Sequence, residues 1–295
     1  MAREKGFLAS HKEARAEGKE PGKNVHLVFA FRRHEEPGKT PEGMSADWLT
    51  EAGKAHAKET GKGLEAEYLM VAGSKGVKRA RETGGLILGS FRDEHGASAI
   101  VNRGMSADQQ KDLGHGEMPP GDRVIYRSGD LDPVKNFAKV VQAAKAEGAM
   151  DLGSQIQWWL DHPAECQAMS VPSSKEIAAE MAHRLSIGLK MSGKLYAGLD
   201  VRFENLTHGP KLEALLKEIL IREGQTGFKR LEEIGGMLQP GENIDFDIRR
   251  DESGQESIKL NLRGHEYDID IAALARLQEL YARRQEANRS AKAKK

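Results

Sequence analysis

The stretch NVHLVFAFRRHEE, residues 24–36, joins an apolar run to a cluster of charged side chains. Its apolar part, residues 25–31, is typical of a strand buried on both faces of a sheet. The run ends at Arg32, Arg33 and His34, and two acids follow. Two arginines and a histidine at the end of a strand predict an anion site there. We expect His34 to be a nucleophile, because a neutral imidazole can form covalent intermediates.

Two other apolar runs end in the same way. Residues 66–72 (AEYLMVA) lead to Ser74 and Arg79, and residues 201–206 lead to His208. Ligands of parallel sheets bind beyond the carboxyl ends of the strands, so neighbouring strands would bring these residues to one pocket. Arginine and histidine side chains around a helix terminus suit a dianionic phosphoryl group in charge and in donor geometry.

The rest of the periodicity predicts helices and one hairpin. The helices are expected over residues 45–60, 77–88, 138–146, 154–160, 173–191, 212–220 and 271–284. Residues 244–248 and 257–262 alternate strictly around a turn at 251–254, which predicts a half-exposed antiparallel hairpin at the sheet edge. Together these elements predict an α/β fold, a three-layer α/β/α sandwich around a mostly parallel sheet with an antiparallel edge hairpin and an inserted lid region.

The composition of each segment suggests the domain boundaries. Residues 1–22 are charged and read as a flexible N-terminal tail or a marginal helix. Residues 23–284 are expected to form a single α/β domain, with an insertion or lid at about 89–172. Residues 285–295 read as a basic disordered tail.

The overall composition excludes several classes of protein. Lys+Arg and Asp+Glu balance at 45 each in 295 residues, which argues against a nucleic-acid binder driven by global charge. The single cysteine, Cys166, rules out an internal disulfide framework and a thiolate zinc cluster, and the histidines show no metal-ligand spacing. No apolar segment has the pattern of a signal peptide or a membrane span, so we expect a cytoplasmic protein that binds neither nucleic acid nor membrane.

Four short motifs, in order, resemble the histidine phosphatase superfamily, which includes the cofactor-dependent phosphoglycerate mutases. RHEE at 33–36 is similar to the family's Arg-His-Gly-Glu signature, and LTEAGKAHA at 49–57 to its Leu-Thr-x-x-Gly-x-x-Gln-Ala segment. SKGVKRARET at 74–83 resembles Ser-x-x-x-Arg-Ala-x-x-Thr with one extra residue, and THGP at 207–210 is similar to the second His-Gly.

The resemblance implies roles for particular residues. His34 would form a phosphohistidine, while Arg33, Arg79 and His208 hold the phosphoryl oxygens. The full phosphate-binding set implied is Arg33, Arg79, His208, Ser74, Thr40 and Gly209. The proton donor of the phosphoglycerate-mutase-like branch would correspond to Glu94, or to Asp93, in the segment DEHG.

The sequence departs from the family pattern at three positions. Glu35 replaces the glycine after the nucleophile and is expected to place a side chain near the phosphate. Thr40 stands in for an asparagine, and His56 replaces the glutamine.

These observations predict a phosphatase that hydrolyses a phosphomonoester through a phosphohistidine, with no cofactor and no metal. One alternative is a phosphoglycerate-mutase-like phosphotransferase. Another is a phospho-ligand-binding protein of the same fold, with Glu35 as the cause of lost turnover. The partner would be a phosphorylated small molecule or macromolecule, with selectivity in residues 89–172 and 39–48. The oligomeric state is left open.

Overall fold

The computed structural model describes residues 7–41, 45–96, 99–101 and 125–293. The chain divides into two compact units. The first consists of Met1–Asp132, Gly188–His208 and Pro240–Arg263, and the second of Pro133–Ile187, Gly209–Gln239 and Gly264–Lys295. These boundaries do not coincide with the tail, lid and domain limits expected from the sequence.

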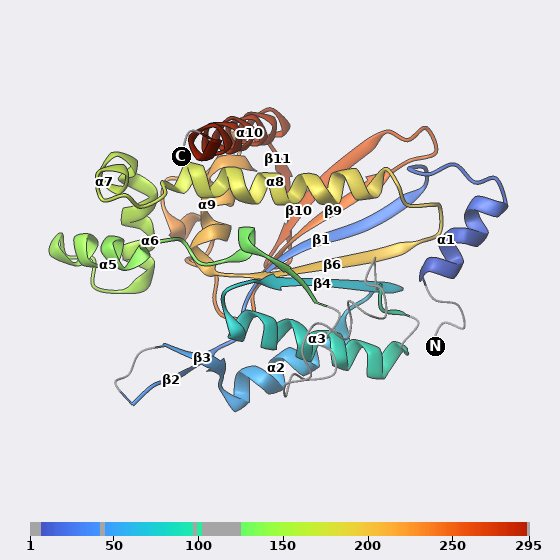
Figure 1. Ribbon diagram of the computed structural model, residues 1–295, viewed down its shortest axis with the longest axis horizontal. Coiled ribbons are helices and arrows are strands. Elements are labelled where there is room, and N and C mark those ends of the chain that lie inside the picture. The colour runs from blue at the N-terminus through green and yellow to red at the C-terminus, as the bar shows by residue number, and fades with distance from the viewer. Residues whose placement is uncertain (1–6, 42–44, 97–98, 102–124, 294–295) are drawn as a thin grey trace. The chain divides into compact units, whose positions relative to one another are not determined.

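A mixed sheet forms the centre of the first unit (Figure 1). The six of its nine strands that belong to this unit are, in spatial order, β5 (Tyr126–Ser128), β4 (Tyr68–Ser74), β6 (Asp200–Thr207), β1 (Val25–Arg33), β9 (Asn243–Arg250) and β10 (Glu256–Leu262). The first four are parallel, whereas β9 is antiparallel to β1 and β10 to β9. The three predicted parallel strands and the predicted antiparallel hairpin are therefore confirmed, but the hairpin is not at the sheet edge, because β9 lies between β1 and β10 and the strand order continues beyond β10.

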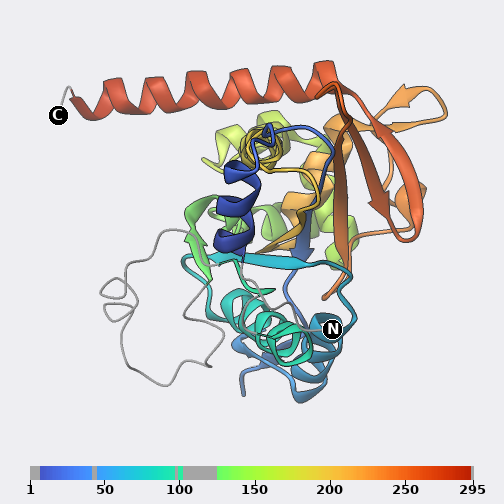
Figure 2. The same ribbon diagram turned by 90° about the vertical axis from the view of Figure 1, so that its right-hand side faces the viewer.

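Helices lie against both faces of this sheet, which gives the predicted α/β/α sandwich. Helices α2 (Glu51–Gly63) and α3 (Lys78–His95) pack on one face, below β4 in Figure 1 and Figure 2. On the other face, α1 (Phe7–Ala16) packs on Tyr68, and residues 188–192, at the end of helix α8 (Ser174–Ser192), approach Phe29. The register supports this division. Leu206 of β6 faces α3, and Phe203 lies three residues before it, so its side chain points to the opposite face, as does that of its partner Phe29.

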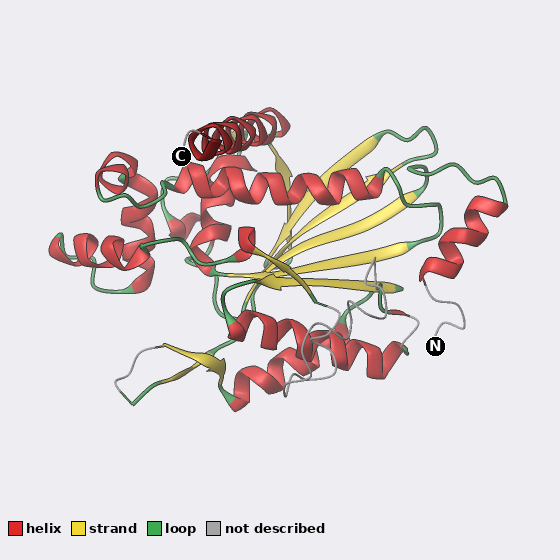
Figure 3. Ribbon diagram, viewed as in Figure 1, coloured by secondary structure: helices red, strands yellow, loops and turns green. Residues whose placement is uncertain are grey.

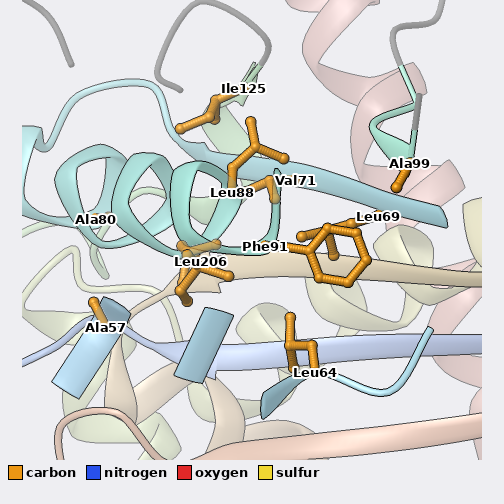
Figure 4. Close-up of a cluster of buried hydrophobic side chains, with 11 residues drawn as sticks. Ala57, Leu64, Leu69, Val71, Ala80, Leu88, Phe91, Ala99, Ile125 and Leu206 are labelled. Atoms are coloured by element: carbon orange, nitrogen blue, oxygen red, sulfur yellow. The ribbon is translucent and has the colours of Figure 1, made fainter. Parts of the chain in front are cut away.

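A cluster of buried apolar side chains joins α3 to the sheet. Figure 4 shows Leu88 and Phe91 of α3 beside Leu69 and Val71 of β4, with Leu206 of β6 next to them. All five side chains are almost fully buried. Their burial fixes α3 on the sheet and so fixes the position of Arg79 in its first turn.

The segment after β1 differs from its prediction. A helix over 45–60 was expected, but the chain forms a small hairpin of β2 (Pro37–Lys39) and β3 (Ser45–Leu49), and α2 begins only at Glu51. Thr50 sets this start, because its Oγ1 accepts a hydrogen bond of 3.0 Å from the Gly53 N–H. The helix therefore begins six residues later than the expected start at residue 45.

Two helices are longer than expected. Helix α3 continues to His95 and ends at Gly96, whose φ of 87° leaves the helical region. Helix α10 (Ile271–Ala293) runs through residues expected to be a disordered tail. Ala, Gln, Glu, Arg and Lys dominate that segment and favour a helix, so charge content alone was a poor guide. Residues 7–16 likewise form α1, in agreement with the marginal helix considered for the N-terminus.

The second unit is mainly helical (Figure 3). It contains α5 (Phe137–Ala146), α6 (Leu152–Asp161), α7 (Pro163–Ala168), α9 (Gly209–Ile219), α10 and the greater part of α8. Its short strands are β7 (Leu220–Arg222), β8 (Gln225–Thr226) and β11 (His265–Ile269), which pair in an antiparallel manner. The helices predicted at 138–146, 154–160 and 173–191 are confirmed. Part of the expected insertion, residues 102–124, lies outside the described residues.

No helix in the described ranges is both long enough and apolar enough to cross a membrane.

The contact between α2 and α3 gives a test of the fold. A Cβ added at Gly61 would collide with the carbonyl oxygen of Ile87, which is backbone and cannot rotate away. We expect Gly61→Ala to lower the free energy of unfolding by roughly 1–3 kcal/mol in urea denaturation. In Gly89→Ala, where no heavy atom lies within 4 Å of the added Cβ, the same substitution should raise it by about 0.5–1 kcal/mol. Equal effects at the two glycines would contradict this helix packing.

Candidate active site

The parallel pairing of β1 with β6 brings two histidines together. The backbone N–H of His34 donates to the carbonyl oxygen of Thr207 over 3.0 Å, so the end of β1 is held beside the end of β6. His208 follows directly, and its ring lies 5.0 Å from that of His34, centroid to centroid, at 69°. Both side chains are buried, at 4% and 6% exposure. The convergence predicted for His34 and His208 is thus observed.

Hydrogen bonds determine the tautomer of His34. Its Nδ1 lies 2.7 Å from the carbonyl oxygen of Glu35, which can only accept a hydrogen bond. Its Nε2 lies 3.1 Å from Nε of Arg79, which can only donate. The proton is therefore on Nδ1, and Nε2 presents its lone pair toward the arginine. A nucleophilic attack by His34 would come from Nε2.

The surroundings keep His34 neutral. Burial in the protein lowers the pKa of His34 to about 4, and the positive charges of Arg79 and Arg33 act in the same direction against the hydrogen bond to Glu35. The unperturbed value is roughly 6.5, so at neutral pH the imidazole carries no charge and its lone pair is available.

Arg79 is held by both the hairpin and α3. It lies in the first turn of α3, and its NH1 group donates to the carbonyl oxygen of Ala46 over 3.0 Å. Burial lowers the pKa of Arg79, and the negative charge of Asp47, the next residue in β3, opposes that shift. Asp47 also accepts a hydrogen bond of 3.0 Å from the Lys78 N–H. The hairpin therefore orients the guanidinium that contacts Nε2 of His34. Neither Asp47 nor Ala46 was singled out from the sequence, since only the folded chain brings β3 to α3.

Arg33 and Arg32 have different surroundings, although they are adjacent. Arg32 is buried and donates two hydrogen bonds to the Glu204 carboxylate and one to the carbonyl oxygen of Gly241. The Arg32 guanidinium is thus bonded within the protein and not directed at the predicted anion site. Arg33 is half-buried, and its backbone N–H donates to the carbonyl oxygen of Glu242, while its charge acts on His34. Arg33 stays a candidate phosphate ligand.

Glu35 has a defined partner. Its carboxylate Oε1 lies 2.9 Å from Nδ1 of His56 on α2, and its own backbone N–H donates to Oγ1 of Thr83 over 3.1 Å. The side chain is 3% exposed, and burial raises the pKa of Glu35 while His56 opposes that rise. The acid expected near the phosphate is therefore bonded to the second departure from the family motif, His56.

Three other predicted phosphate ligands have different surroundings. The Ser74 hydroxyl donates to Oδ1 of Asp132 over 2.5 Å and accepts the Val77 N–H, so its proton is committed within the protein. Thr40 follows β2, and within the described residues its buried Oγ1 has no hydrogen-bond partner. Gly209 is the first residue of α9, in the second unit.

Asp93 and Glu94 lie far from His34. Both are in the last turn of α3, whereas Arg79, which contacts His34, is in the first. Fourteen residues separate Arg79 from Asp93, or about 21 Å along the helix at 1.5 Å per residue. Asp93 is paired with Arg92 at 3.0 Å, and both acids are exposed. This corrects the prediction that one of them protonates the leaving group, which assumed that α3 ends before residue 89.

Comparison with known proteins yields remote structural likenesses. No model of a protein family matches the chain, and no curated protein matches it. The structure titled mycobacterial hydrolase 2 is 14% identical over 87% of this chain and 97% of its own, with a TM-score of 0.47. A mycobacterial glucosyl-3-phosphoglycerate phosphatase is 15% identical over 81% and 97%, with a TM-score of 0.45. A structure from Escherichia coli K-12, titled as an alpha-ribazole-5'-P phosphatase, is 12% identical over 81% and 98%, with a TM-score of 0.38.

The neutral state of His34 can be measured directly. We expect its ¹⁵N NMR titration to have a midpoint near 4, with Nδ1 protonated and Nε2 unprotonated at pH 6–8. The unfolded chain binds this proton near pH 6.5, so in the window from about 6.5 down to 4 the unfolded state holds more protons than the folded state. The contribution of His34 to stability should therefore fall as the pH falls through that window. A midpoint between 6 and 7 would contradict the burial and charge effects described above.

Proposed function

We propose that this protein is a phosphatase that hydrolyses a phosphomonoester through a phosphohistidine on Nε2 of His34. The observation that carries the proposal is the contact of a neutral, Nδ1-protonated imidazole with the side chain of Arg79. A nucleophile with its lone pair directed at a guanidinium donor suits a phosphoryl group better than a neutral electrophile.

In the first step, Nε2 attacks the phosphorus, an N–P bond forms and the P–O bond to the ester oxygen breaks. Arg79 moves its N–H from Nε2 to a phosphoryl oxygen, a short displacement because the donor already lies 3.1 Å from the attacking atom. Arg33 and His208 would contact the other oxygens, so the charge that develops in the transition state meets fixed donors. The leaving oxygen takes a proton from an acid not yet assigned.

In the second step, water attacks the phosphorus and gives a proton to the same group that protonated the leaving oxygen, and the N–P bond breaks. Inorganic phosphate leaves, and His34 returns to its neutral form with the proton still on Nδ1. The hydrogen bond to the carbonyl oxygen of Glu35 persists through both steps and stabilises the positive charge of the phosphorylated ring.

The surroundings of Glu35 favour the enzyme over a binding protein without turnover. That alternative depended on a carboxylate close to the phosphate. The Glu35 carboxylate is instead bonded to His56, and Oε2 faces Gly241 at 2.7 Å from the position of an added Cβ. The chain offers no observation that favours a mutase over a hydrolase, and transfer to water needs the fewest additional groups.

Trapping the intermediate tests the mechanism. Brief incubation with a ³²P-labelled phosphomonoester should label the protein, and the label should be labile in acid and stable in alkali. His34→Ala should abolish both labelling and the hydrolysis of p-nitrophenyl phosphate. Hydrolysis that persists in purified His34→Ala would refute the assignment of the nucleophile, and a wild-type protein without turnover would refute the phosphatase.

A pair of nearby arginines tests the phosphate site. Arg79→Ala should lower kcat/KM for p-nitrophenyl phosphate by roughly 10²–10³, the usual loss when a transition-state donor is removed. Arg81→Ala is a matched control two residues along α3, because its guanidinium donates to the carbonyl oxygen of Lys75 and not to His34. Arg81→Ala should retain activity within about twofold. Similar losses in both variants would indicate general damage to α3 and contradict a specific role for Arg79.

A further inference from the structure

The peptide group of Glu35 is fixed from several sides. Its carbonyl oxygen accepts the Nδ1–H of His34 at 2.7 Å, and its N–H donates to Oγ1 of Thr83 at 3.1 Å. The Thr83 hydroxyl in turn donates to the carbonyl oxygen of Arg79 at 3.0 Å. One residue therefore links the nucleophile to the turn of α3 that carries Arg79. Any movement of this peptide would change the hydrogen bond that sets the tautomer of His34.

The Glu35 side chain is a second anchor for the same peptide. Its carboxylate is 3% exposed, and a buried carboxylate is costly unless it is paired. Arg32, whose positive charge acts on Glu35, already uses its donors on Glu204 and on the carbonyl oxygen of Gly241. The carboxylate pairs with His56, at 2.9 Å, whose side chain is 61% exposed.

Gly241 forms the opposite wall of this position. Its φ of 83° is rare for residues with a side chain, and a Cβ there would lie 2.7 Å from Oε2 of Glu35. Its N–H is 3.2 Å from the carbonyl oxygen of Arg33 and 3.3 Å from that of His34. The carboxylate is thus confined between Gly241 and His56.

Helix α2 gives His56 a fixed position against the segment after the nucleophile. The Thr50 N–H donates to the carbonyl oxygen of Glu36 over 3.0 Å at the start of the helix. At Gly53 an added Cβ would lie only 2.9 Å from the same oxygen, which shows how closely the helix approaches. His56 stands one turn further along, so its imidazole is presented to Glu35 from a rigid frame.

We propose that His56 is a positioning residue for the nucleophile and acts through Glu35. By holding the Glu35 carboxylate, it fixes the carbonyl group that receives the Nδ1–H of His34 and so keeps the lone pair on Nε2. The proposal rests on the proposed function, because it assigns His56 a part in the reaction of His34. Without His56, the carboxylate would turn toward water and displace its own peptide, and His34 would lose the partner that selects its tautomer.

Three single variants on α2 test this role. In His56→Ala the hydrogen bond is lost, and kcat should fall roughly 10- to 100-fold with KM changed by less than about threefold. His56→Asn should restore most of kcat, because the asparagine amide nitrogen is the same number of bonds from the backbone as Nδ1 of histidine. Glu59→Ala is the matched control, since it removes a 2.7 Å pair with Lys62 from the same helix without touching Glu35.

A double-mutant cycle and NMR separate positioning from general damage. Because the effect passes through Glu35, the losses in Glu35→Ala and His56→Ala should not add in the double variant. The ¹⁵N spectrum of His34 should show one tautomer in wild type and in His56→Asn, and a mixture in His56→Ala. That spectrum can be recorded without turnover. It therefore tests the positioning role of His56 even if the protein proves not to be a phosphatase.

Several results would overturn the proposal. An unchanged His34 tautomer together with unchanged kcat in folded His56→Ala would do so. So would an equal loss in the alanine and asparagine variants, an equal loss in Glu59→Ala, or a loss confined to KM. Loss of activity in every variant with the His34 tautomer intact would also count against it.

Discussion

The parallel pairing of β1 with β6 is the constraint on which the candidate site depends. His34 and His208 are far apart in the sequence, yet the register pairs Arg33 with Thr207, so the residues that follow the two strands must emerge side by side. The pairing continues one step beyond the strands, where the His34 N–H donates to the Thr207 carbonyl. A shift of one residue would turn one histidine to the other face of the sheet.

A buried charge network holds that register. Arg32 bonds Glu204 of β6 in a bidentate manner and also bonds the Gly241 carbonyl, and Arg202 bonds Glu204 and Asp245 of β9. Burial would raise the pKa of Glu204, but the two arginines hold it below its ordinary value. Such networks add little net stability, yet a displaced register would leave a buried carboxylate unpaired. The network therefore selects one alignment of β6, β1 and β9.

Local sequence signals were enough for most of the fold and for part of the site. Apolar runs identified the parallel strands, and strict alternation identified β9 and β10, because side-chain periodicity reports burial directly. The errors arose where a local signal had a competing meaning. Residues 45–60 suggested one helix where residues 45–49 form a strand of a small hairpin, and charged residues at 285–293 suggested disorder where they form a helix. His34, Arg79 and His208 were found because each directly follows or begins an element, whereas the Glu35–His56 and Arg79–Ala46 contacts exist only after folding.

The Glu35–His56 pair also shows why a motif should be judged by contacts and not position by position. Taken singly, glutamate in place of glycine adds a buried charge next to a nucleophile, and histidine in place of glutamine looks neutral. In the folded chain the two residues form a pair. The buried Glu35 carboxylate has a hydrogen-bond partner, and the exposed His56 imidazole is held against it. Gly241 must then lack a side chain, since a Cβ would occupy the space of the carboxylate. Glu35, His56 and Gly241 are widely separated in the sequence but fit together locally. Glu35, which first argued against catalysis, thus becomes part of the support for the proposed nucleophile.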